Sequence, residues 1–105
     1  MWPCPLRDSL SWSVSFREGI TIMPLFMDVH TIDGGVALED VAKAHAADLQ
    51  VQSKHDVQYL RYWVNEDGGK VFCLVDAPDT DAAASVHREA HGLLADQIFA
   101  VREGL

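Results

Sequence analysis

From Pro24 onward, apolar positions recur with the two-residue period of strands and the 3.6-residue period of helices. Residues 25–30 alternate in the first way and predict a strand, which Gly34 and Gly35 follow. A helix is then predicted to end near Gln52, because apolar side chains recur along one of its faces. That face carries Leu38, Val41, Ala42, His45 and Leu49.

A β-hairpin is predicted in the middle of the chain. Residues 57–65 have the composition of an aromatic-rich strand, and Asp67, Gly68 and Gly69 are typical of a tight turn between paired strands. Residues 70–75 are therefore the expected antiparallel partner, ending where Pro78 approaches.

A second amphipathic helix and a short final strand complete the pattern. Residues 79–94 have helical periodicity, and Asp79, Thr80 or Asp81 can cap the first turn. Gly92 should loosen the end of this helix, and residues 97–101 form an apolar run of strand length.

The resulting order, β-α-β-β-α-β, predicts an α+β ferredoxin-like sandwich: a four-stranded antiparallel sheet with two helices on one face. The first and third strands should lie at the centre. Strict alternation places Phe26, Tyr59 and Trp63 together on one face of the sheet and smaller aliphatic residues on the other. Two apolar faces in so small a domain predict a homodimer packed sheet against sheet, as a dimeric α+β barrel.

Residues 1–22 lack this periodicity, and we expect them to lie outside the domain of residues 23–105. The segment has no basic start, apolar centre or cleavage site of a signal peptide. The codons of Glu18 and Gly19 can form a purine-rich ribosome-binding sequence. Met23 would then be the native start.

The composition limits the partners. Of 105 residues, 49% are hydrophobic, and the net charge is −8, all of it carried after residue 22. Such acidity disfavours nucleic acid, and no apolar run approaches the roughly 18 residues that span a membrane. The two cysteines, Cys4 and Cys73, give no disulfide framework, so we expect a reducing, cytoplasmic location.

The histidines are the candidate chemistry. His87 and His91 stand four residues apart, so they share one helical face and could reach one metal ion. A metalloprotease helix needs glutamate directly after the first histidine, and Arg88 stands there instead. The alternative is two solvated residues near a helix end.

The remaining candidates are His30, His45 and Cys73. His45 lies on an apolar helical face and should point toward the sheet, where one hydrogen bond to the backbone or a carboxylate is the simpler explanation. His30 ends the first strand, and its face could be the one opposite the helices, which would separate it from His45. If these three groups converge with His87, the four ligands favour zinc, nickel or copper over calcium or magnesium. His55 is expected in an exposed turn.

Residues 23–105 resemble the small nickel-responsive, nickel-binding proteins of actinobacteria. The resemblance covers nearly all of the domain and none of residues 1–22. It rests on these stretches: PLFMDVH (24–30), AHAADL (44–49), GKVFCL (69–74), AP (77–78), VHREAHG (86–92) and ADQI (95–98).

The resemblance implies a ferredoxin-like fold, dimers and nickel binding. Its natural ligands are the histidines in the matching stretches, with Cys73 as a further candidate. Ni²⁺ among nitrogen and oxygen donors would be octahedral or tetragonal, completed by carboxylate or water. The implied set is His30, His45, His87, His91 and Cys73.

Three functions remain open from the sequence. The first is a cytoplasmic metal-binding protein, for nickel or else zinc or copper, in storage or homeostasis. The second is a small dimeric enzyme of the monooxygenase kind, an analogy of fold alone. The third is a non-catalytic ligand-binding module. A cluster of imidazoles favours the first.

Overall fold

The computed structural model describes residues 16–17, 20–21 and 24–104. Strands β1 (Phe16–Arg17) and β2 (Ile20–Thr21) pair with each other, in a sheet separate from the larger one. The expectations for residues 1–15, Cys4 included, and for Met23 concern residues outside the described part.

The main sheet has the predicted topology. Its strands are β3 (Leu25–Thr31), β4 (Gln58–Asn65), β5 (Lys70–Asp76) and β6 (Gln97–Val101), in the order β4-β5-β3-β6 and all antiparallel. The first and third of these along the chain, β3 and β5, form the centre. The ferredoxin-like arrangement expected from the sequence is confirmed.

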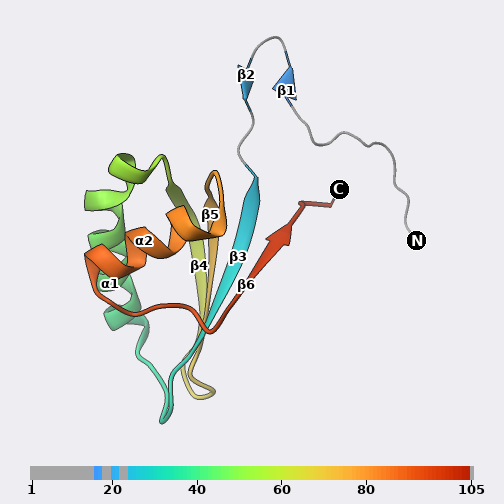
Figure 1. Cartoon of the computed structure of the whole chain (residues 1–105). Helices are drawn as coiled ribbons and strands as arrows, with labels where there is room; N and C mark the ends of the chain where they lie inside the picture. Colours follow the sequence, from blue (N-terminus) through green and yellow to red (C-terminus); the bar gives the residue numbers. More distant parts are fainter. Residues whose placement is uncertain (1–15, 18–19, 22–23, 105) are drawn as a thin grey trace.

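Both long helices, α1 (Leu38–Val51) and α2 (Thr80–Ala90), lie on the same side of the sheet (Figure 1). A 3₁₀ turn, η2 (Gln52–His55), follows α1. Asp79 is the residue that caps α2, because its Oδ1 accepts a hydrogen bond from the Ala82 amide at 2.8 Å. No helix of the described segments is long and apolar enough to cross a membrane.

Helix α2 is shorter than the sequence predicts. It ends at Ala90 instead of continuing to residue 94, and His91 is its C-cap. Gly92 adopts a φ of +81°, and the amides of His91 and Gly92 both donate to the carbonyl of His87. A glycine in this left-handed conformation ends a helix, so the apolar Leu93 and Leu94 belong to the following loop.

The prediction that Tyr59 and Trp63 share a face is wrong. A β-bulge between Tyr59 and Arg61 shifts the register of β4 against β5. Tyr59 therefore faces the helices and is 3% exposed, whereas Trp63 faces the open side and is 47% exposed. A bulge adds one residue to one strand and so reverses the alternation beyond it.

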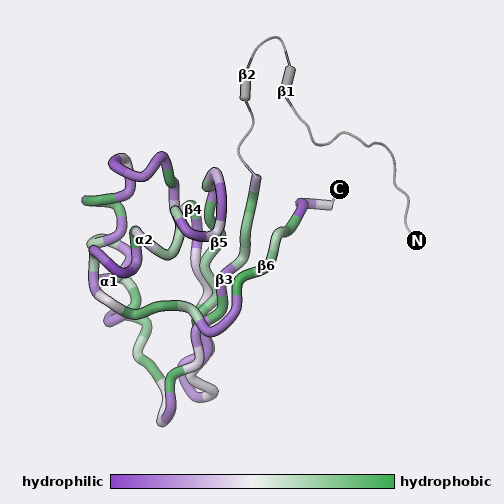
Figure 2. Tube along the Cα trace, viewed as in Figure 1, coloured by the Kyte–Doolittle hydropathy of each residue, from purple (hydrophilic) through white to green (hydrophobic). Residues whose placement is uncertain are grey.

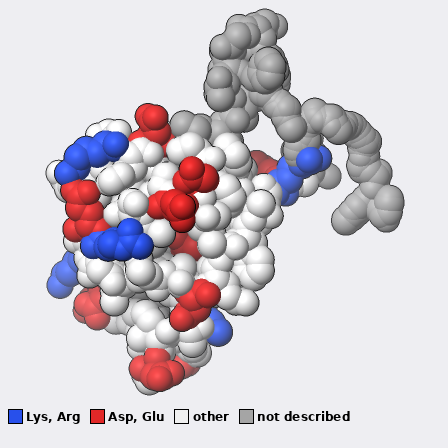
Figure 3. All heavy atoms as spheres, viewed as in Figure 1, with Lys and Arg blue, Asp and Glu red and all other residues white. Residues whose placement is uncertain are grey.

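The core fills the layer between the helices and the sheet. Val57, Val75, Ala77, Ala83 and Val86 are almost completely buried there. Apolar stretches also continue along the strands, as Figure 2 shows. On the opposite sheet face, Trp63 and Phe99 remain half exposed. Acidic side chains are spread over the surface seen in Figure 3.

Gly69 is predicted to be required for the β4–β5 turn. Its φ is +66°, and an added Cβ would lie 2.0 Å from the Ile32 carbonyl oxygen. Gly34 also has a positive φ, of +86°, but open space around it. Gly34→Ala should therefore lower the free energy of unfolding by about 1–2 kcal/mol, and Gly69→Ala by clearly more. Urea denaturation of both variants checks this; equal losses would contradict it.

Candidate metal centre

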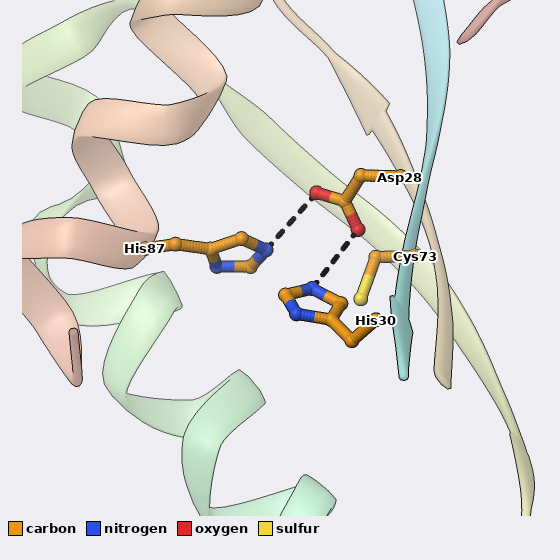
Figure 4. Close-up of side chains that lie close together, drawn as sticks. All are labelled: Asp28, His30, Cys73 and His87. Atoms are coloured by element: carbon orange, nitrogen blue, oxygen red, sulfur yellow. Dashed lines mark hydrogen bonds and ion pairs between the residues drawn. The ribbon is translucent and has the colours of Figure 1, made fainter. Parts of the chain in front are cut away.

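Four buried side chains from three elements meet on the helix-facing side of the sheet. Asp28 and His30 come from β3, Cys73 from β5 and His87 from α2, as Figure 4 shows. The strand register places Asp28 directly opposite Cys73. One ligand atom from each residue lies within 4.8 Å of the others. We call these four residues the inner cluster.

His87 is held between two carboxylates. Its Nε2 lies 3.0 Å from Asp28 Oδ2, and its Nδ1 lies 2.9 Å from Asp48 Oδ1 on α1. Both aspartates and the histidine are at most 2% exposed. His87 therefore joins α2 to the sheet and to α1 through charged, buried contacts.

Asp28 has a further polar neighbour and one unsatisfied oxygen. The Tyr59 hydroxyl donates to Asp28 Oδ2 at 3.0 Å, and the Tyr59 ring stacks on His87 with 4.4 Å between centroids. Asp28 Oδ1 lies 3.3 Å from His30 Nε2 (Figure 4) but accepts no hydrogen bond from the described residues. A buried carboxylate oxygen without a hydrogen bond is a natural position for a cation to contact.

A second group, Asp48, His87 and His91, overlaps the first. His91 Nε2 lies 3.0 Å from Asp48 Oδ1, while its Nδ1 accepts a hydrogen bond from the Leu93 amide. His87 and His91 thus share a face of α2, as their spacing predicts, and Asp48 lies beside both. We call Asp48 and His91 the outer pair.

The other two histidines belong to neither group. The His45 ring packs beside Tyr62, with 4.8 Å between centroids. Asp48, three residues later on α1, is the side chain that reaches His87. His55 lies in η2, and its Nε2 is 3.0 Å from Glu89 Oε1, so it is partnered rather than a free turn residue.

The sequence left open whether His30 faces away from the helices, and it does not. Its ring lies 5.0 Å from that of His87, centroid to centroid. Sequence reasoning did not include Asp28, Asp48 or Tyr59 in the site. Asp28 could have been found from its position two residues before His30, and Asp48 from its helical spacing with the buried Val41.

The carboxylates control the protonation of the site. Burial alone would lower the pKa of His87, but its hydrogen bonds to Asp28 and Asp48 raise it to about 9. Burial would raise the pKa of Asp28, yet the contacts with His30 and His87 hold it well below its ordinary value. For Cys73, burial and the charge of Asp28 raise the pKa of the thiol.

These donors fit a transition metal ion. Two imidazoles, a thiol and a carboxylate are ligands of nickel, zinc or copper, whereas calcium and magnesium prefer oxygen alone. The Oδ1 of Asp28, which accepts no hydrogen bond from the described residues, also favours a bound cation. A dication would replace the protons of His87 and Cys73, because metal ligands must be deprotonated.

A cavity of about 90 Å³ adjoins the inner cluster. His30, Cys73 and His87 line it together with His45, the outer pair and apolar residues of α1 and the sheet. The centre is therefore open on one side to a small chamber.

Comparison with known proteins identifies the family of this chain. The family model described as "Nickel responsive protein SCO4226-like" matches residues 26–101. The chain belongs to this family. A crystal structure of SCO4226 from Streptomyces coelicolor A3(2) superimposes with a TM-score of 0.71 at 33% identity, covering 77% of this chain and 99% of that one. A search of curated proteins found no match.

Membership of the SCO4226-like family confirms the resemblance inferred from the sequence. The match contains both the inner cluster and the outer pair, since Asp28 and His91 are the first and last of these residues.

The metal-free chain should lose stability as the pH rises from about 6.5 to about 9. The folded His87 has a pKa of about 9 against an ordinary 6.5, so the folded chain binds the extra proton in this range. The stabilisation by this proton is complete below the ordinary pKa and is lost as the pH rises through the folded pKa. The free energy of unfolding should fall by no more than about 1.4 kcal/mol per pH unit.

Urea unfolding with a chelator present, repeated across this range, measures the effect. His87→Gln should flatten the dependence of the unfolding free energy on pH. His55→Gln, a change at a partly exposed histidine, should leave this dependence unchanged. Equal slopes in the two variants would contradict the assignment to His87.

Proposed function

We propose that this protein binds Ni²⁺ at the inner cluster and serves in nickel storage or homeostasis. The observation that carries the proposal is the convergence of Asp28, His30, Cys73 and His87 within 4.8 Å in a buried position. The nickel-responsive family supports nickel as the metal.

Each residue has a distinct part in this proposal. His30 and His87 supply imidazole nitrogen, Cys73 supplies thiolate sulfur, and Asp28 supplies a carboxylate oxygen. Nδ1 of His87 faces Asp48 at 2.9 Å, which leaves Nε2 on the side of the inner cluster. A carboxylate in this position fixes the orientation and tautomer of a ligating histidine.

The outer pair completes the support. Asp48 contacts both His87 and His91, so it couples the last turn of α2 and its C-cap to α1. We propose that His91 acts through Asp48 and that His45, which packs on Tyr62, is not a ligand. Of the five ligands expected from the sequence, the proposal therefore keeps His30, Cys73 and His87.

A cytoplasmic location and the domain limits are part of the same proposal. The buried Cys73 is a free thiol, which suits a reducing compartment. All residues of the site lie within residues 26–101, in agreement with a functional domain of residues 23–105.

Titration calorimetry with nickel, zinc and copper tests the site. His87→Ala should abolish measurable nickel binding, and Cys73→Ser, which preserves size, should weaken it strongly. Asp48→Asn should weaken it by about 10–100-fold, the usual effect of losing a group that orients a ligand.

His45→Ala is the matched control, because His45 lines the adjoining cavity but belongs to neither ligand group. It should bind nickel like the unaltered chain. Undiminished nickel binding in both His87→Ala and Cys73→Ser would exclude the inner cluster as the nickel site. Loss of binding in His45→Ala alone would show that His45 is a ligand, as the sequence predicted.

We also propose that a second copy of the chain covers the open sheet face. Trp63 is 47% exposed and Phe99 is 48% exposed there, and isolated soluble domains rarely leave such residues in one apolar surface. The opposite face is already filled by the two helices.

Light scattering coupled to size-exclusion chromatography tests the homodimer. The unaltered chain should have twice the monomer mass, and Trp63→Glu with Phe99→Glu should reduce it to the monomer. Leu49→Glu, on the exposed side of α1 at 46% exposure, should leave the dimer intact. A monomeric unaltered chain would refute the proposal.

A further inference from the structure

The cavity beside the inner cluster has two kinds of wall. One wall is the cluster itself, through His30, Cys73 and His87. The rest is mainly apolar, and its surface comes from α1, the sheet and the loop between β3 and α1. These apolar residues include Ile32, Val36, Val41, Ala44, Tyr62 and Val71. Four polar side chains also reach the cavity, from Asp40, His45, Asp48 and His91.

Asp28 is the one member of the inner cluster that does not line the cavity. The carboxylate is therefore on the inner side, and the two imidazoles and the thiol are on the side of the chamber. A molecule in the cavity would therefore contact His30, Cys73 and His87 but not Asp28.

The charges disfavour an anion in this position. The buried carboxylates of Asp28 and Asp48 already balance a dication, and a thiolate at Cys73 would add a further negative charge. An uncompensated charge against a mainly apolar wall is costly, whereas a neutral donor adds none.

The size of the cavity restricts the molecule further. One water needs roughly 10–15 Å³ on this measure, so about 90 Å³ admits a molecule of several non-hydrogen atoms. A mainly apolar wall with a few polar groups is typical of sites for small organic ligands.

We propose that the cavity binds a small, neutral nitrogen-donor molecule with an apolar body, its nitrogen directed at the metal of the inner cluster. The proposal rests on the proposed nickel site and goes beyond it, because it assigns the protein a second, organic ligand. In this arrangement the valines and Tyr62 select the body, and the acidic surroundings exclude carboxylates.

Imidazole and 1-methylimidazole are the probes, titrated by calorimetry into the nickel-loaded full chain and, for reference, into aqueous nickel ion. The added methyl group is predicted to be buried against the apolar wall. For each of the two, the affinity for 1-methylimidazole is divided by the affinity for imidazole. This ratio should be about fourfold larger for the nickel-loaded chain than for aqueous nickel ion.

Ala44→Leu tests the cavity directly. Ala44 lines it and is partly buried on α1, whereas Ala46 on the same helix is exposed. Ala44→Leu should weaken 1-methylimidazole binding by about tenfold or more with nickel affinity unchanged, and the control Ala46→Leu should change neither. Leucine is a good helix former, so both variants should fold.

The outcomes separate the two proposals. Normal nickel uptake with no added preference for 1-methylimidazole, or equal binding in the two leucine variants, overturns the organic ligand and leaves the metal site standing. Failure of the unaltered chain to take up nickel overturns the metal site, and the organic ligand with it.

Discussion

The contact on which this structure depends is His87 between Asp28 and Asp48. Burying two carboxylates costs several kcal/mol of desolvation for each, and a nearby positive charge is needed to offset this cost. The raised pKa of His87 supplies that charge in the metal-free chain. Because the three side chains come from β3, α1 and α2, this one cation fixes both helices to the sheet.

The same contact explains why the site suits a metal ion. A dication at the inner cluster provides the positive charge that the proton on His87 provides in its absence, so folding and metal binding draw on the same carboxylates. Tyr59 supports the arrangement from β4 by donating to Asp28 and stacking on His87. The bulge that follows Tyr59 changes which way the later residues of β4 face and leaves Tyr59 on the helix side.

The fold could be predicted because its signals are local: alternation in β3, the Asp67 to Gly69 turn and the cap at Asp79 all agree. The bulge in β4 has no such signal, and Trp63 was misplaced for that reason. In the site, His30, Cys73 and His87 were found by residue type. The helical pattern cannot tell His45 from Asp48, since both fall on the inner side of α1, and only the position of α2 decides which one is used.

Anomalous diffraction at the nickel absorption edge, from crystals of the nickel-loaded chain, tests the central claim most directly. We expect one strong peak per chain within bonding distance of His30, Cys73 and His87, with Asp28 on its inner side. A peak at His45 or at the surface, with the inner cluster empty, would contradict it.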